Sequence, residues 1–125
     1  MKKIVLPVFL STVWISISEF FRNQVLLNHY WTKHYDSLGL VFPSTPINGV
    51  VWGIWSLCFA VLIYILSGKF TLIRTTFISW LAGFVLMWLV IGNMNFLPYA
   101  MLLFAIPLSF LEAFLASFII FKLKK

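Results

Sequence analysis

Two of the three acidic residues in this chain of 125 lie inside long apolar stretches. Glu19 follows Lys3 by 16 positions, about 24 Å along a helix axis, and Glu112 precedes Lys122 by ten positions, about 15 Å. An isolated carboxylate in apolar surroundings is costly, so such groups are neutralised, paired or functional. We therefore regard Glu19 and Glu112 as the candidate proton- or solute-binding groups.

Glu19 has polar neighbours on its own helical face. Arg22, three positions on, can form an ion pair with it, and Asn23, four positions on, shares the same side. One interpretation is a structural ion pair that fixes the outer end of the helix. The other is a proton-accepting or cation-binding carboxylate that faces a cavity.

Glu112 has no cation within one turn of its own helix. Either it holds a proton, because burial disfavours the charged form, or another helix supplies a partner. We expect Arg74 to be that partner, since its long side chain can reach up the bundle from the cytoplasmic end. The alternative is a neutral acid that is hydrogen-bonded to Ser109 or to a neighbouring hydroxyl group. Beside these structural roles, Glu112 is a candidate for proton coupling or substrate binding.

The composition identifies the medium around these acids. Charged residues make up 10% of the chain, against about 25% in soluble domains, while 62% are apolar and the mean hydropathy is +1.03. A folded chain this small would expose a continuous apolar surface in water. We therefore expect a lipid bilayer to surround it. A disulfide framework is excluded, because Cys58 is the single cysteine.

Uncharged runs set the number of membrane passes. The run from Thr75 to Leu111 is too long for one crossing, and it turns back between Gly92, which can end a helix, and Pro98, which can begin one. No period-two alternation favours a β-barrel. The sequence predicts an all-α, single-domain, four-helix transmembrane bundle with an outer loop at about 28–45. The predicted helices span about 4–27, 46–67, 70–91 and 98–122.

The cations indicate the orientation. Seven of the nine Lys and Arg residues fall on one side of a four-pass chain, and Arg22 and Lys33 fall on the other. The positive-inside rule then predicts that both termini are cytoplasmic. The same rule accounts for the net charge of +6, so nucleic acid is not expected as a partner. We expect a multi-pass protein of the bacterial plasma (inner) membrane.

The first helix has a second interpretation. Its charged start, apolar middle and small residues also fit a secretory signal that is cleaved after Ser18. Apolar character resumes at Phe20 and Phe21 and again at Val25, however, which makes the segment long enough to span a membrane.

Two further patterns concern packing. Trp31, Tyr35 and Leu38 share one helical face, so an interfacial helix or an extension of the first helix is expected in the outer loop. Gly49 and Gly53, four positions apart in the second helix, are expected to let a neighbouring helix approach closely.

Catalytic signatures are missing from the sequence. It contains no GxSxG, phosphate-loop, HExxH or CxxC motif, so an enzyme is not expected. His29 and His34 are five positions apart and do not share a helical side, and no third ligand is placed by spacing. Neither a metal ion nor another cofactor is therefore expected.

Several motifs resemble those of a group of small uncharacterised bacterial four-helix membrane proteins. They are residues 18–23, 30–31, 34–35, 38–44 and 48–53, and the similarity covers nearly the whole chain. This resemblance implies the location and the architecture, and it carries no assigned activity.

The chain is also similar in part to the small multidrug resistance family, which has four short helices and a glutamate in the first. Glu19 is the matching acid, and the resemblance implies proton-coupled efflux there. The chain departs from that family in its long outer loop and in the second acid, Glu112.

These observations predict a protein that binds or transports a small solute or proton through a polar site between helices one and four. Glu19 and Glu112 would be the titrating groups, Arg22 and Arg74 their counterions, and Asn23 and Ser109 polar neighbours. The alternative is a structural or accessory membrane subunit whose acids only hold helices together. Four short spans enclose little volume, so a homodimer or a membrane partner protein is expected.

Overall fold

The computed structural model describes residues 2–43 and 45–124, and in this part of the chain all regular structure is helical. Four of the helical segments are long and apolar enough to cross a membrane: Lys3–Leu26, Pro46–Ser67, Leu72–Asn93 and Tyr99–Leu123. The prediction of an all-α bundle with four apolar helices is thereby confirmed, with ends that differ from the predicted ones by at most two residues.

Two of the four long segments contain a wider π-helical turn. In chain order, the first of the four long segments consists of α1 (Lys2–Phe20) and the π-helical η1 (Phe21–Leu26). The second long segment is α3 (Pro46–Ser67). The third consists of α4 (Leu72–Trp80), the π-helical η2 (Leu81–Val85) and α5 (Leu86–Asn93). The fourth begins with the 3₁₀ turn η3 (Tyr99–Met101) and continues as α6 (Leu102–Leu123). The predicted loop helix is present as α2 (Asn28–Ser37).

Capping residues explain where two helices begin. Thr45 and Asn48 form a capping box, in which the backbone N–H and the hydroxyl of Thr45 both donate to Asn48 Oδ1, at 3.0 and 2.7 Å. α4 begins at Leu72 rather than at position 70 because the Thr71 hydroxyl accepts a hydrogen bond from the Arg74 backbone N–H.

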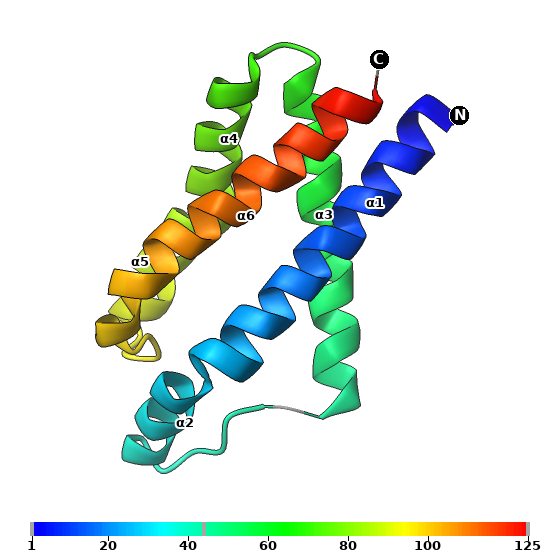
Figure 1. Ribbon diagram of the computed structural model, residues 1–125. Coiled ribbons are helices and arrows are strands. Elements are labelled where there is room, and N and C mark those ends of the chain that lie inside the picture. The colour runs from blue at the N-terminus through cyan, green and yellow to red at the C-terminus, as the bar shows by residue number, and fades with distance from the viewer. Residues whose placement is uncertain (1, 44, 125) are drawn as a thin grey trace.

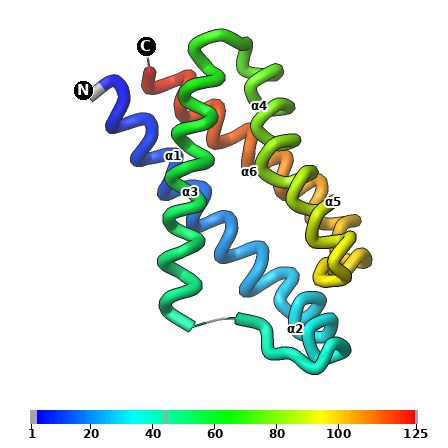
Figure 2. Tube along the Cα trace, turned by 180° about the vertical axis from the view of Figure 1, so that it is seen from behind, coloured from blue at the N-terminus to red at the C-terminus, as the bar shows by residue number. Residues whose placement is uncertain are grey.

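The helices run up and down, so that both ends of the chain lie at one end of the bundle (Figure 1). The turn between α3 and α4 lies at this same end, while α2 and the turn between α5 and η3 lie at the opposite end (Figures 1 and 2). α1 packs against α3 and α6, and α6 also packs against α4. In both views α1 crosses α3, and the two helices diverge toward the α2 end.

Aromatic rings fill the contact between α3 and η2. The ring of Phe59 stacks on Trp55 with centroids 5.0 Å apart and meets Phe84 edge to face at 5.5 Å. Gly83 makes room for this arrangement, because a Cβ atom there would lie 2.5 Å from Cε1 of Phe59.

The expectation for Gly49 and Gly53 is wrong. A Cβ atom at either position would meet no atom within 4 Å, so among the described residues no helix approaches these glycines closely. The two residues instead border open space between α1 and α3, where the helices diverge.

We expect Gly83→Ala to destabilise the bundle, because the Phe59 ring is held between Trp55 and Phe84 and cannot move aside. Overpacking of this kind costs about 1–3 kcal/mol, which should lower the thermal unfolding midpoint in detergent. Gly53→Ala is the matched control, since its new methyl group enters open space. Equal midpoints for the two variants would contradict this account of the packing.

Candidate functional site

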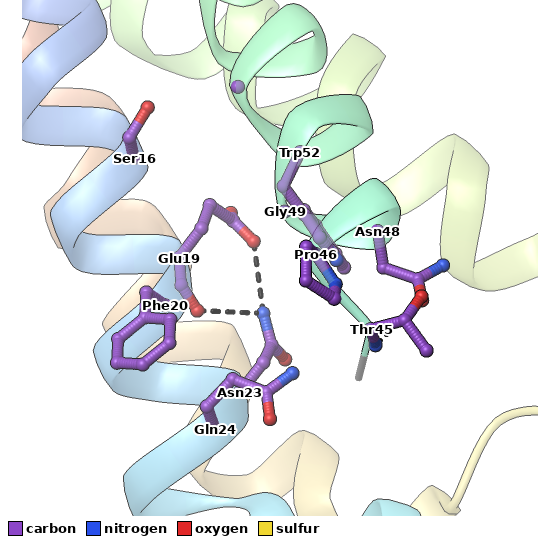
Figure 3. A pocket seen from close by; sticks show the side chains of 11 residues that line it. Ser16, Glu19, Phe20, Asn23, Gln24, Thr45, Pro46, Asn48, Gly49 and Trp52 are labelled. Carbon is purple, nitrogen blue, oxygen red and sulfur yellow. Dashed lines mark hydrogen bonds between the residues drawn. The ribbon is translucent and has the colours of Figure 1, made fainter. Parts of the chain in front are cut away.

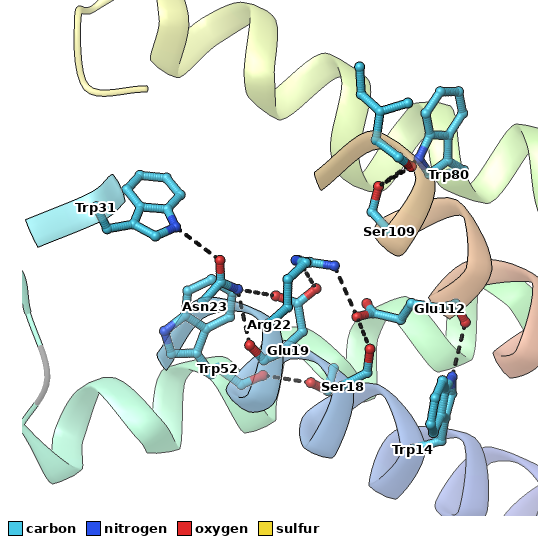
Figure 4. Close-up of polar contacts among 12 residues, drawn as sticks. Trp14, Ser18, Glu19, Arg22, Asn23, Trp31, Trp52, Trp80, Ser109 and Glu112 are labelled. Carbon is cyan, nitrogen blue, oxygen red and sulfur yellow. Dashed lines mark hydrogen bonds and ion pairs between the residues drawn. The ribbon is translucent and has the colours of Figure 1, made fainter. Parts of the chain in front are cut away.

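Arg22 lies at the centre of a buried polar cluster. Its Nη2 atom donates to Glu19 Oε1 at 2.7 Å, and its Nη1 atom donates to Glu112 Oε1 at 3.1 Å (Figure 4). One guanidinium group therefore binds two carboxyl groups, one from α1 and one from α6, that are far apart in the sequence.

The end of α1 and the π-helical η1 position the first half of the cluster. Asn23 Nδ2 donates to Glu19 Oε2 at 3.0 Å and to the Glu19 carbonyl oxygen at 3.1 Å. The Asn23 Oδ1 atom in turn accepts a hydrogen bond from Trp31 Nε1 at 3.0 Å, which connects the cluster to α2. A π-helical turn is rare and is frequently found at functional sites.

Side chains of α1 hold Glu112 from across the helix interface. The Ser18 hydroxyl donates to Glu112 Oε1 at 2.6 Å, and Trp14 Nε1 donates to the Glu112 carbonyl oxygen at 3.0 Å. On the other side of the cluster, the guanidinium of Arg22 lies 5.1 Å from the ring centroid of Phe84. The three charged side chains are thus fixed by α1, η1, η2 and α6 together.

Burial makes the charge balance of the cluster decisive. Glu19 is 2% exposed, Glu112 is 1% exposed and Arg22 is 6% exposed. Within residues 2–43 and 45–124, Arg22 is the single cation paired with these two carboxyl groups. With both acids ionised the cluster would carry a net charge of −1 in apolar surroundings, which is strongly unfavourable.

One atom of the cluster is left without a partner. Glu112 Oε2 is buried and makes no hydrogen bond to any residue that the structure describes. A proton on this oxygen, or a positively charged group beside it, would bring the net charge to zero. The arrangement can therefore hold one proton or one small cation in addition to the ion pair.

Two of the six candidate residues from the sequence do not join the cluster. Arg74 is exposed in α4 and is not the partner of Glu112, because the side chain of Arg22 reaches it instead. Side chains on a helix project back toward its N-terminus, which brings the Arg22 guanidinium down toward the level of Glu112. Ser109 accepts a hydrogen bond from Trp80 Nε1 at 2.9 Å and donates to the Ile106 carbonyl oxygen.

Sequence reasoning missed Ser18, Trp14 and Trp31. Ser18 had a usable signal, since it precedes Arg22 by four positions and so shares its helical face. The indole groups of Trp14 and Trp31 had none, because the partner of Trp14 lies on α6 and that of Trp31 lies within the π-helical η1.

Two cavities border the cluster and share Glu19, Asn23, Asn48 and Trp52. The lateral cavity, of about 400 Å³, lies between the end of α1 and the start of α3 (Figure 3). The aromatic cavity, of about 320 Å³, also touches Arg22 and lies under α2 and the following segment. Its aromatic lining residues are Trp31, Tyr35, Phe42, Trp52, Trp88 and Phe96.

No grouping of three or more His, Cys, Asp and Glu residues that could hold a metal ion occurs in residues 2–43 and 45–124. The two carboxyl groups of the cluster come with a bound guanidinium, which is unlike a metal-ligand set.

We expect Arg22→Gln to lower the free energy of unfolding by about 3 kcal/mol or more, because it leaves two buried acids without a counterion. Arg74→Gln, which removes an exposed arginine, is the matched control and should change stability by less than about 0.5 kcal/mol. Unfolding in detergent, followed by circular dichroism, measures both.

A triple variant tests the electrostatic cause. Adding Glu19→Gln and Glu112→Gln to Arg22→Gln removes all three charges, so most of the lost stability should return. Equal stability of Arg22→Gln and Arg74→Gln would contradict the central place of Arg22.

Comparison of the chain with models of protein families, with curated proteins and with solved structures found no match. What the protein does is therefore inferred from the chemistry and geometry of its own side chains.

Proposed function

We propose that this multi-pass membrane protein binds a proton or a small solute at the cluster of Glu19, Arg22 and Glu112 and moves it across the membrane. The observation that supports this proposal is the count of charges, since two buried carboxyl groups share one guanidinium. Such a cluster is neutral only with one additional positive charge, and it returns to a net charge of −1 when that charge leaves. The net charge of the cluster therefore changes whenever the additional proton or cation binds or leaves.

The two cavities give this site a route to its surroundings. The lateral cavity reaches Glu19 between α1 and α3, and the aromatic cavity reaches Glu19 and Arg22 from beneath α2. A site that only locked helices together would need neither opening. A pair of chains would enclose a larger pathway than four short helices, so we include a homodimer in the proposal.

Charge distribution supports a cytoplasmic position for both termini. The bundle end with the termini and the α3–α4 turn holds segments that contain Lys3, Lys69 and Lys124, whereas α2 at the other end contains Lys33. The positive-inside rule then orients the protein with the cluster nearer the outer surface of a bacterial plasma membrane.

A second candidate function is that of an accessory subunit whose acids are structural. The hydrogen bonds and ion pairs around the cluster favour it. Ser18, Asn23 and Arg22 together occupy three of the four carboxyl oxygen atoms of Glu19 and Glu112. Under this alternative, Glu→Gln variants would lose stability or recovery of a partner and leave proton movement unchanged.

Infrared spectroscopy of the protein in lipid vesicles tests the proton directly. In neutral buffer the wild-type protein should show the carbonyl-stretch band of a protonated carboxylic acid. Both Glu112→Gln and Glu19→Gln should abolish it, because the remaining acid then balances Arg22 and needs no proton. Asp36→Asn, which changes the exposed third acid, should keep the band.

The same vesicles report transport when they are loaded with a pH-sensitive dye. The wild-type protein should dissipate an imposed pH gradient at least about tenfold faster than Glu112→Gln, with Asp36→Asn unchanged. Identical decay for wild type, Glu112→Gln and empty vesicles would reject proton movement and favour the accessory alternative.

Orientation is tested by cysteine labelling in a Cys58→Ser background. A membrane-impermeant maleimide added outside bacterial spheroplasts should modify Asp36→Cys in α2 and spare Lys69→Cys in the α3–α4 turn. Lysis should then expose position 69. The opposite labelling pattern would show that the termini face outward.

A further inference from the structure

An apolar groove and the more polar lateral cavity lie next to each other between α1 and α3. The apolar groove, of about 640 Å³, is lined mainly by aliphatic and aromatic side chains. They belong to Ile4, Val5, Val8, Phe9, Thr12, Val50, Gly53, Ile54, Leu57, Val61 and Tyr64. Gly53 also lines the lateral cavity, so the apolar groove and the lateral cavity meet at that residue.

The polar end of the groove lies against the cluster. Glu19 and Asn23 of the first helical segment lie across the lateral cavity from Pro46 and Gly49 of α3, and half-buried Ser16, Gln24 and Asn48 also line it (Figure 3). Carboxylate, carbonyl and amide groups of this kind accept and donate hydrogen bonds to hydroxyl groups.

The charges at this end of the groove determine which head group of an amphiphilic ligand can bind there. Among the residues that the structure describes, no Lys, Arg or His lines either the lateral cavity or the apolar groove, and the one charged group there is the carboxyl group of Glu19. A phosphate head would meet that carboxyl group with no free cation to bind it, because the guanidinium of Arg22 is already shared by Glu19 and Glu112, and this is unfavourable. An uncharged head with hydroxyl groups meets hydrogen-bonding partners and no repulsion.

The apolar part has the dimensions of a lipid tail. Val50 and Tyr64, at its two ends on α3, are separated by about 21 Å along the helix axis, which is comparable to the whole length of an extended oleoyl chain. Gly53 keeps the groove open near the start of α3, because a Cβ atom there would meet no atom of another element within 4 Å.

We propose that this groove binds a single-chain amphiphile with an uncharged, hydroxyl-bearing head, whose tail lies between α1 and α3 and whose head lies against Glu19 and Asn23. The inference deepens the proposed function and rests on it, since it names the class of solute that reaches the same cluster. Hydrogen bonds to the head and burial of the tail provide the affinity.

Native mass spectrometry of the full-length protein with two matched probes tests this proposal. The probes are 1-monooleoylglycerol and 1-oleoyl-lysophosphatidate, which share one tail and differ in the phosphate. The wild-type protein should retain the uncharged probe at least about tenfold better than the phosphate probe. Gly53→Leu, which fills the junction of groove and cavity, should reduce retention of the uncharged probe about tenfold.

Leu89→Phe is the control, because it enlarges an exposed side chain of α5 outside the groove and should leave retention unchanged. Gly49→Leu provides a second blocking variant if Gly53→Leu does not fold, since its side chain enters the lateral cavity that Gly53 also lines. Equal retention of both probes would overturn the proposal and indicate ordinary surrounding lipid. A third outcome would overturn the proposal in favour of a second copy of the chain in the groove. In that case the wild-type protein would retain neither probe, and Gly53→Leu would lose a dimer that the wild-type protein forms.

The infrared and pH-gradient measurements separate this inference from the proposed function. Equal retention of the two probes beside an intact carboxylic-acid band and proton movement would remove the amphiphile and leave the proton site. Selective retention without that band would support the amphiphile site and reject the proton.

Discussion

One guanidinium group shared by two buried carboxyl groups is the interaction on which this structure depends. Arg22 reaches Glu19 on its own helix and Glu112 on α6, and all three side chains are nearly inaccessible. Each charge would be prohibitively costly alone in apolar surroundings, so the contact between α1 and α6 is also the condition for burying them. The ion triad is incomplete in charge, however, because one cation faces two acids. Because of this charge imbalance, the contact between α1 and α6 is also a candidate binding site.

Several distant elements serve this one contact. The π-helical η1 contains Arg22 and Asn23, Trp14 and Ser18 bind α6 from the face of α1, and Phe84 of η2 lies beside the guanidinium. The α3 helix takes part differently, since Gly49 and Gly53 leave space beside Glu19 rather than fill it. The fold therefore encloses the cluster on the α6 side and leaves it approachable on the α3 side. The α6 helix thus holds the cluster in place, and the α3 helix leaves room for a ligand to approach it.

The long segments and the two acids were predictable from the sequence because hydropathy, capping residues and isolated charges are local signals. Uncharged runs, Thr45-Pro46 and Gly92 to Pro98 placed the four helices within one or two residues. Depth counting along each helix also identified Glu19 and Glu112 as buried. It misassigned the partner of Glu112 to Arg74, because counting ignores helix crossing and the direction in which an arginine side chain projects. The π-helical turns and the open space at Gly53 depend on tertiary packing, so no local sequence pattern predicts them.

The shared guanidinium can be measured with little ambiguity because the chain contains only two arginines and two glutamates. Solid-state NMR of the protein in lipid, with ¹⁵N-labelled arginine and ¹³C-labelled glutamate carboxyl groups, reports which of these groups are in contact. The account predicts strong dipolar couplings from both glutamate carboxyl carbons to the side-chain nitrogens of Arg22, unchanged when Arg74 is replaced by lysine. A coupling to Glu19 alone, or a coupling of Glu112 that disappears with Arg74, would contradict it.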